Sequence, residues 1–207
     1  MSLQSKEKDH STEELIKRSA KKIFQEKGFA ATRTRDIAEE AGINLALLNY
    51  YFRSKQKLFD LIMLETLQEF IQSISVVFND RNSTLEEKIE AFAHRYIDFL
   101  LGQPNIPLFI LNEIKGKPEH IIDNVPMKSI LLQSHFTQQY EKAVMDEELP
   151  QLDFMHFLMN LIALTVFPFI ASPLLKPLGG ISNERFREMM LERKKLIPKW
   201  IGLLKAI

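Results

Sequence analysis

The stretch AGINLALLNYYFRSK, residues 41–55, carries side chains that suit contacts with base edges and phosphates. On a helix with about 100° per residue, Leu48 and Phe52 share one face, while Leu47 and Tyr50 point to the opposite side. A carboxamide can bond adenine, a small apolar side chain can touch a thymine methyl, and a tyrosine hydroxyl can hold a phosphate. Periodicity alone leaves two alternatives, in which Leu47 and Tyr50 either meet DNA or pack under a neighbouring helix.

Four cations stand at the predicted starts of two helices, where the helix dipole prefers acidic side chains. Arg33 and Arg35 precede one short helix, and Lys55 and Lys57 open a longer one. Each placement costs roughly a few tenths of a kcal/mol unless a phosphate docks there, where backbone N–H groups and cations act together. Because the two helix starts flank the outward-facing helix, they favour a DNA backbone on both sides of it.

The pattern Ala38-x-x-x-Gly42-Ile43-Asn44 has the spacing of a helix-turn-helix. A small residue allows two helices to cross closely, a glycine can take positive φ in the turn, and an apolar anchor follows. The helix that Asn44 caps is then the recognition helix, whose outward residues meet base edges in the major groove.

The elements that position these residues are predicted to be helices throughout, because no alternating strand pattern and no internal repeat occurs. Capping boxes at 11–14 and 83–86, glycines and prolines set the boundaries. Besides the short helix after Asn44, the predicted helices cover 12–27, 36–41, 54–78, 83–101, 106–115, 118–124, 126–147, 152–172 and 182 to the end, with a kink at Pro198.

Composition restricts the class of protein. With 207 residues and 45% hydrophobic content, the chain can bury a full core. The absence of cysteine excludes a disulfide scaffold, a thiolate nucleophile and a Cys-ligated zinc site. No apolar run near the start resembles a signal peptide, so we expect a cytoplasmic protein. The net charge is zero, but residues 1–60 hold twelve Lys and Arg against nine Asp and Glu, which favours nucleic acid at that end.

The longest apolar tract, residues 157–175, is nearly long enough to span a bilayer. Asn160, Pro168 and Pro173 interrupt it, so we expect a buried helix and no membrane association.

The motifs that carry a family resemblance lie in the first 60 residues. They are Gly28-Phe29, Thr32-Arg33-Thr34-Arg35-Asp36-Ile37-Ala38, Ala41-Gly42-Ile43, and Tyr50-Tyr51-Phe52-Arg53-Ser54-Lys55 with Leu58-Phe59. Together they resemble the DNA-binding domain of the TetR/AcrR family of bacterial transcriptional regulators. The rest of the chain resembles that family only in length and helical content.

We expect a flexible segment at 1–10. The resemblance implies a three-helix helix-turn-helix domain at 11–56 and a larger helical domain at 57–207 for ligand binding and dimerisation. At the positions where family members contact bases or the adjacent backbone, this chain has Arg35, Leu45, Ala46, Leu47, Asn49 and Tyr50. At the positions where family members bind phosphates, this chain has Thr34, Tyr51 and Lys55. Arg33 and Asn44 complete the expected DNA-binding set. Many members have Tyr at position 49 and Thr or Ser at 47, so the operator sequence cannot be copied from relatives.

The expected function is that of a repressor that leaves a pseudo-palindromic operator when a small, largely apolar effector binds. The candidate effector residues are aromatic or histidine side chains on the middle helices, for which plain core packing is the alternative: Phe92, Tyr96, Phe99, Phe109, His135, Phe136, Tyr140 and Phe157. An apolar stripe is expected to form a homodimer interface: Met159, Ile162, Val166, Met189, Ile197, Trp200 and Leu204.

Two other classes compete with this interpretation. An enzyme is not expected, because His94, His120, His135 and His156 have no metal-ligand spacing, and neither a Gly-rich phosphate loop nor a nucleophile elbow occurs. We therefore expect no metal and no cofactor. A helical ligand-binding or interaction protein without operator binding remains the alternative, although it leaves the cations at the helix starts unexplained.

Overall fold

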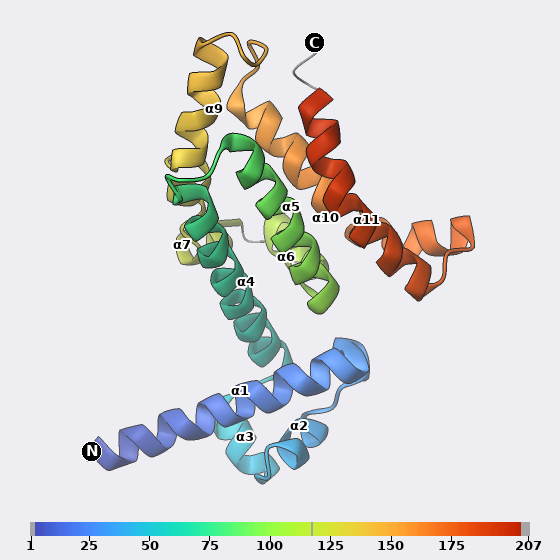
Figure 1. Cartoon of the computed structure of the whole chain (residues 1–207). Helices are drawn as coiled ribbons and strands as arrows, with labels where there is room; N and C mark the ends of the chain where they lie inside the picture. Colours follow the sequence, from blue (N-terminus) through green and yellow to red (C-terminus); the bar gives the residue numbers. More distant parts are fainter. Residues whose placement is uncertain (1–2, 117, 204–207) are drawn as a thin grey trace. The chain divides into compact units, whose positions relative to one another are not determined.

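The computed structural model describes residues 3–116 and 118–203, with side chains from residue 10 onward, and every regular element in these ranges is a helix (Figure 1). The predicted all-α fold is therefore confirmed. The chain divides into two compact units, residues 1–66 and 67–207. The helices are α1 (Leu3–Ala31), α2 (Thr34–Glu40), α3 (Leu45–Tyr51), α4 (Lys55–Asn79), α5 (Leu85–Gly102), α6 (Ile106–Gly116), α7 (Pro118–Asn124), α8 (Met127–Leu132), α9 (His135–Met145), α10 (Phe154–Gly179) and α11 (Asn183–Leu203).

Helix α1 begins earlier than the sequence suggested. It starts at Leu3, where we predicted a flexible segment over 1–10, and residues 1–2 lie outside the described residues. The predicted capping box at 11–14 lies inside the helix, because the preceding Gln, Lys and Glu residues are good helix formers that let it continue backward. The predicted end is confirmed at Gly28, where φ of 75° interrupts the helix.

The core of the first unit joins α1, α2, α3 and the first turns of α4. Phe24 meets Phe59 edge to face with ring centroids 5.2 Å apart, and Phe29 lies 4.6 Å from Phe59. Leu58 and Ile62 are buried as well. This packing extends the first unit to Thr66, beyond the boundary at 56 that the sequence suggested.

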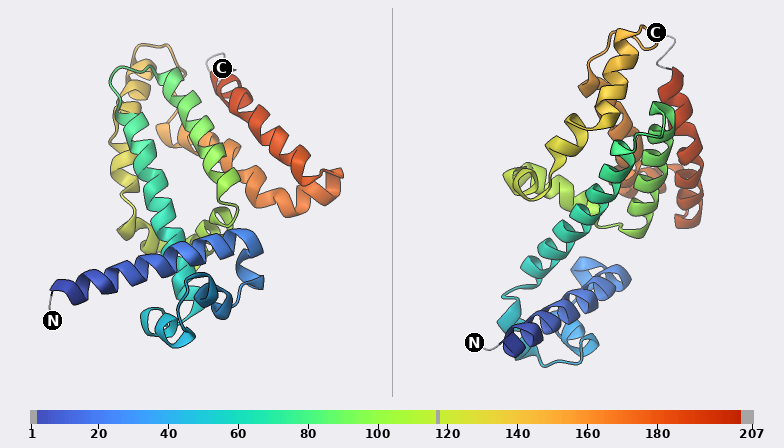
Figure 2. Two further views of the ribbon diagram at one scale, coloured as in Figure 1. Left: turned by 60° about the horizontal axis from the view of Figure 1, so that its bottom comes forward. Right: turned by 60° about the vertical axis from the view of Figure 1, so that its left-hand side comes forward.

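The second unit is built around α5, which packs against α9, α10 and α11. Both views of Figure 2 show α11 running alongside α5. Inside the unit Phe78 stacks on Phe136 at 4.2 Å, and Phe157 lies 4.6 Å from Tyr140. Aromatic stacking therefore fills the centre of this helical layer.

The cap of α5 lies one residue later than predicted. Thr84, not Ser83, accepts the N–H of Glu87 at 3.2 Å, and the Glu87 carboxylate accepts the N–H of Thr84 at 2.8 Å. The hydroxyl and carbonyl of Ser83 instead accept from Lys88 Nζ. Because Ser-Thr and Glu-Glu pairs stand side by side in the sequence, both registers satisfy the capping pattern.

The predicted helix over 126–147 is two helices, α8 and α9, because Ser134 interrupts it. Its buried hydroxyl caps α9 by accepting the N–H of Thr137. A serine competes with the helical backbone for hydrogen bonds, so it can start a helix as well as continue one.

Helix α10 runs past the predicted end at 172, through Pro173 and Pro177, to a left-handed Gly180. Pro168 has no N–H, so the carbonyl of Leu164 loses its partner within the helix. The guanidinium of Arg193 on α11 donates to that carbonyl at 2.6 Å.

Two helices, α4 and α10, are long and apolar enough to cross a membrane by length and composition alone. The prediction that the tract at 157–175 is a buried helix is wrong for the single chain, since only 22% of the apolar window of α10 is buried. α10 packs against α5, α6, α9 and α11, and these contacts leave much of its surface open.

Candidate nucleic-acid interface

The turn between α2 and α3 has the local geometry that its sequence predicts. Gly42 adopts φ of 64°, and the N–H of Ile43 donates to the carbonyl of Ala38 at 3.0 Å. Ala38 is buried where the two helices meet. The side chain of Asn44 accepts the N–H of Leu47 at 2.8 Å and so caps α3. These contacts confirm the predicted helix-turn-helix and its cap.

Helix α3 has one buried and one exposed face within the first unit. Leu48 is 1% exposed and Phe52 is buried with it, whereas Tyr50 is 76% exposed. Ala46 and Asn49 are exposed, and Leu45 and Leu47 are half-buried. Tyr50 therefore does not pack under another helix of this unit, and its ring meets that of Tyr51 edge to face at 5.3 Å.

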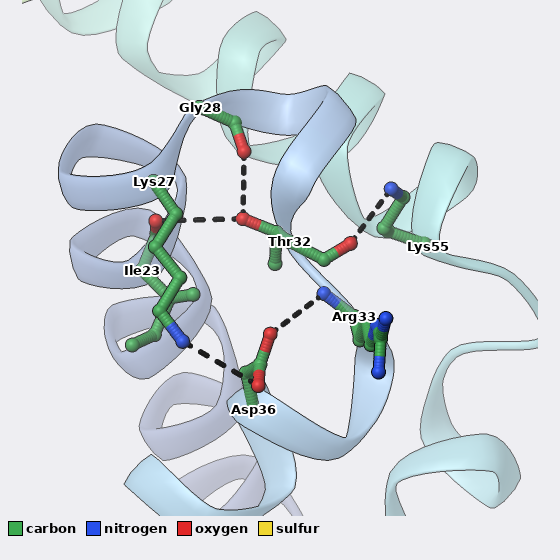
Figure 3. A network of polar contacts seen from close by, with 7 residues as sticks. All are labelled: Ile23, Lys27, Gly28, Thr32, Arg33, Asp36 and Lys55. Atoms are coloured by element: carbon green, nitrogen blue, oxygen red, sulfur yellow. Dashed lines mark hydrogen bonds and ion pairs between the residues drawn. The ribbon is translucent and has the colours of Figure 1, made fainter.

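The segment between α1 and α2 is held by a polar network (Figure 3). The hydroxyl of Thr32 donates to the carbonyl of Gly28 at 2.7 Å. The N–H of Arg33 donates to the carboxylate of Asp36 at 2.8 Å, which lies 3.4 Å from the ammonium of Lys27. The Arg33 N–H first, and Lys27 in addition, lower the pKa of Asp36 below its usual value. The network fixes the start of α2.

The prediction that Lys55 is placed at a helix start to bind phosphate needs a correction. The ammonium of Lys55 donates to the carbonyl of Thr32 at 2.8 Å (Figure 3). It also donates to the carbonyl of Phe29 at 2.8 Å and lies 4.3 Å from the centre of the Phe29 ring. These carbonyls explain a lysine at this helix start without a phosphate. Asp36 likewise supplies the acidic group that the first turn of α2 prefers.

The remaining cations are exposed around α3. Arg33, Arg35, Arg53 and Lys57 have exposed side chains, and Thr34 is half-buried at the start of α2. None of the ion pairs formed among the described residues involves Arg35, Arg53 or Lys57. They lie close in sequence to the exposed side chains of α3, where an anionic ligand can meet them.

A second candidate site is a cavity of about 630 Å³ in the second unit. Its walls come from α4, α5, α6, α7, α8 and α10, with Ile71, Ile110 and Ile121 among the lining side chains. Of the aromatic residues predicted to bind an effector, only Tyr96 lines it. The aliphatic lining of α6 and α7 was missed, because apolar side chains on short helices look the same in sequence whether they face a cavity or a core.

The other aromatic candidates pack against one another or against neighbouring rings. Phe92, Phe109, Phe136 and Phe157 are buried, and Phe99 stacks on Phe70 at 4.0 Å. The hydroxyl of Tyr140 donates to the carbonyl of Leu152, and the half-buried ring of His135 has an Nδ1 atom without a partner. The structure thus places most of this set in the core.

The residues predicted for a dimer interface are divided among three environments. Met159, Ile162 and Val166 line the cavity, and Ile197 is fully buried inside its own chain. Met189 lines a separate groove between α10 and α11. Trp200 is half-buried beneath the guanidinium of Arg193, which lies 4.9 Å from its ring, and Leu204 lies outside the described residues. Phe167, Leu174, Leu178 and Leu191 were not in the predicted set, yet they are exposed on α10 and α11.

Among the described residues no group of three His, Asp or Glu side chains is arranged to hold a metal ion. His120 instead bonds Glu113, with 2.6 Å between Nδ1 and Oε2, and so links α7 to α6.

Comparisons with known proteins agree with this geometry. Residues 16–62 match the family model described as bacterial regulatory proteins of the tetR family. The helix-turn-helix transcriptional regulator YttP of Bacillus subtilis is 23% identical over 167 residues, which make up 77% of this chain and 78% of YttP.

Solved structures share the fold. A TetR/AcrR-family regulator from Thermobifida fusca superposes with a TM-score of 0.68 at 18% identity, over 90% of this chain and 96% of the other. The regulator FadR of Bacillus subtilis, solved in complex with stearoyl-CoA, has a TM-score of 0.59 at 15% identity, over 88% of this chain and 96% of FadR.

Proposed function

The chain belongs to the TetR/AcrR family of helix-turn-helix transcriptional regulators, and from this premise we propose that its dimer represses transcription from a pseudo-palindromic operator until a small effector releases it. The observation that carries the proposal is the exposed face of α3, on which Tyr50 is 76% exposed beside exposed Asn49 and Ala46. A large aromatic side chain that a helix exposes to water is a candidate contact for a ligand.

On this proposal α3 enters the major groove. Asn49 bonds a base edge, Ala46 and Leu47 meet thymine methyl groups, and Tyr50 and Arg35 contact bases or the adjacent backbone. The exposed Lys57 and Arg53 hold phosphates, as do the N–H groups at the start of α2. Lys55 acts indirectly, because its contacts with the carbonyls of Phe29 and Thr32 position α4 against the end of α1.

A second copy of the chain supplies the symmetry that the operator requires. Leu174 and Leu178 are exposed on α10, and Leu191 is exposed on α11. Exposed apolar side chains on two neighbouring helices support a four-helix interface between two chains. Sedimentation at micromolar concentration should give a species of two chains, and a species of one chain would exclude the dimer.

Selection of bound sequences from a random DNA pool tests the operator proposal. A dimer should select an inverted repeat with half-sites roughly 34–36 Å apart. Arg35→Ala and Tyr50→Ala should each weaken binding of the selected site by about 1–3 kcal/mol. Arg187→Ala, which removes an exposed cation from α11, is the matched control and should leave affinity unchanged. Parent-like binding by both DNA-face variants would contradict the assignment of α3.

The effector is proposed to bind in the cavity of the second unit. Helix α4 carries Lys55 in the first unit and Ile71 in the cavity wall, so a shift of this helix can link the two functions. Coupling of about 1–3 kcal/mol lowers operator affinity roughly 5- to 150-fold, and it must weaken effector binding equally when DNA is bound. A ligand with equal affinity for free protein and for the operator complex is not the effector.

A further inference from the structure

The cavity of the second unit has a nearly uniform chemical lining. Its volume of about 630 Å³ is within the usual range of small-molecule sites, roughly 300–1,000 Å³. The lining side chains are aliphatic, methionine, proline or phenylalanine, with Tyr96 the one exception among the described residues. Burial of an apolar ligand here therefore removes apolar surface of the ligand and of the cavity wall from water.

Tyr96 supplies the polar group of the lining. The side chain is 9% exposed, and its ring packs 4.7 Å from Phe70 and 5.2 Å from Phe92. These rings hold the phenol in one orientation. Burial raises the pKa of Tyr96 to about 12, so the hydroxyl stays protonated at neutral pH and offers one donor as well as an acceptor.

The cavity offers nothing to compensate a buried charge. No Lys, Arg, His, Asp or Glu lines it among the described residues. On α6, α7 and α8, the described Lys, Asp and Glu side chains are Glu113, Lys115, Glu119, Asp123 and Lys128, none of which lines the cavity, and Glu113 is already bonded to His120. A carboxylate or phosphate needs cations or several donors when it leaves water, and the described part of these walls provides neither.

We infer that the cavity takes an uncharged, aliphatic molecule with a single hydroxyl or carbonyl group, and that this group bonds the hydroxyl of Tyr96. The inference rests on the proposed function, because it names the chemical class of the regulator's effector. The exposed side chains of Ile114, Ile122 and Met159 form an apolar rim, which suits entry of an aliphatic chain.

Three probes of equal chain length test, on the intact protein, whether the ligand must be uncharged. Decan-1-ol, decanoate and decanoyl-CoA are titrated by calorimetry at neutral pH. Decan-1-ol should bind at least about tenfold more tightly than decanoate, because the carboxylate loses its hydration without gaining a cation. Tighter or equal binding of decanoate or decanoyl-CoA would overturn the inference while leaving the operator proposal intact.

Three variants test the position of the polar group and of the cavity. Tyr96→Phe should weaken decan-1-ol binding about fivefold, the loss expected for one neutral hydrogen bond. Tyr140→Phe removes a hydroxyl outside this cavity and should leave decan-1-ol binding unchanged. Ile110→Trp narrows the cavity and should weaken decan-1-ol about tenfold or more, since cores and cavities tolerate little added volume. Unchanged binding by Tyr96→Phe would overturn the assigned contact.

Operator binding is measured in parallel, so that the two proposals fail separately. If a second copy of the chain fills the cavity, none of the three probes will bind, and the inference is overturned although the operator is still selected. If decan-1-ol binds as expected and no DNA sequence is selected, the inference stands for the cavity and the proposed function fails.

Discussion

Each compact unit contains a lysine near the start of a helix, and the ammonium of this lysine donates to carbonyls at or just beyond the end of an earlier helix. In the first unit Lys55 bonds Phe29 and Thr32, and in the second Lys88 bonds Asp80 and Ser83. Lys88 is fully buried, whereas Lys55 is half-buried. The same kind of contact therefore uses a buried ammonium in the second unit and a half-buried one in the first.

The difference in burial between Lys88 and Lys55 affects whether an outside ligand can approach their surroundings. Carbonyls that a helix end leaves unpaired need donors, and a lysine supplies up to three. Around Lys88 all three acceptors belong to the protein, including the hydroxyl of Ser83, and burial lowers the pKa of the ammonium. Around Lys55 the neighbouring surface is exposed and carries Lys57. Lys55 thus holds the segment between α1 and α2, in which the side chain of Arg33 stays exposed.

The largest effect is expected at Lys88. Lys88→Met keeps the length of the side chain and leaves the carbonyls of Asp80 and Ser83 without their donor. The free energy of unfolding, measured by urea denaturation, should fall by about 3 kcal/mol, as for other buried charge-assisted contacts. The exposed Lys128→Met is the control and should change it by less than about 0.5 kcal/mol. Equal losses of unfolding free energy in Lys88→Met and Lys128→Met would show that burial of Lys88 does not make its contacts more stabilising.

Lys55→Met should lower the free energy of unfolding by about 1–2 kcal/mol, less than Lys88→Met because the side chain of Lys55 is only half-buried, so its hydrogen bonds already compete with water. It should leave the salt dependence of DNA binding nearly unchanged. The exposed Lys57→Ala should instead preserve stability and reduce the slope of log affinity against log salt by about 0.9, the value for one phosphate contact. A reduced slope with unchanged stability in Lys55→Met would make Lys55 a phosphate ligand after all.

A third cation–carbonyl contact, between Arg193 and Leu164, can be tested by a double-mutant cycle with Pro168. Arg193→Met removes the donor, and Pro168→Ala restores an N–H that can bond Leu164 within α10. The loss caused by Arg193→Met should be smaller by about 1 kcal/mol in the Pro168→Ala background. Stacking of Arg193 on Trp200 is lost in both backgrounds and cancels. Purely additive losses would show that Pro168 does not create the need for Arg193.

The smallest effect is expected at Asp36, whose carboxylate is exposed enough for water to compete. Its pKa is lowered by the N–H of Arg33 and by Lys27. Because the pKa is lower in the folded state, the ionised carboxylate stabilises the folded protein at pH values above the ordinary pKa of 3.8. This contribution is lost as the pH falls through the folded-state pKa. Asp36→Asn should melt below the parent at pH 7, and the gap should narrow toward pH 3. A gap that does not depend on pH would rule out a role for the charge.

Local contacts were largely predictable. Gly28 and Gly42 adopt positive φ, and Asn44 and Ser54 cap helices as their sequence positions predict. The cap at Thr84 was missed by one residue because the neighbouring Ser83 fits the same pattern. Each of these features depends on residues within four positions, so the chain's own spacing contains the information.

The contacts of Lys55 and Arg193 were not predictable, because their acceptors are main-chain carbonyls far along the sequence. Lys55 bonds a carbonyl 26 residues away, and Arg193 bonds one 29 residues away. Every residue has a carbonyl, so no residue type marks the one that will lack a partner. Only the packing of α11 on α10 brings Arg193 to Leu164.

The sequence by itself determined that Leu48 and Tyr50 lie on different faces of α3, because the 3.6-residue period of a helix separates them wherever the helix docks. That the face of Tyr50 is exposed was decided by the tertiary structure. Only the tertiary structure decided that Met159 and Ile162 line a cavity while Ile197 is buried in the core. All three are large apolar residues on long helices, and the hydrophobic effect has no direction. Their surroundings therefore depend on which helices pack beside them and where those helices leave space.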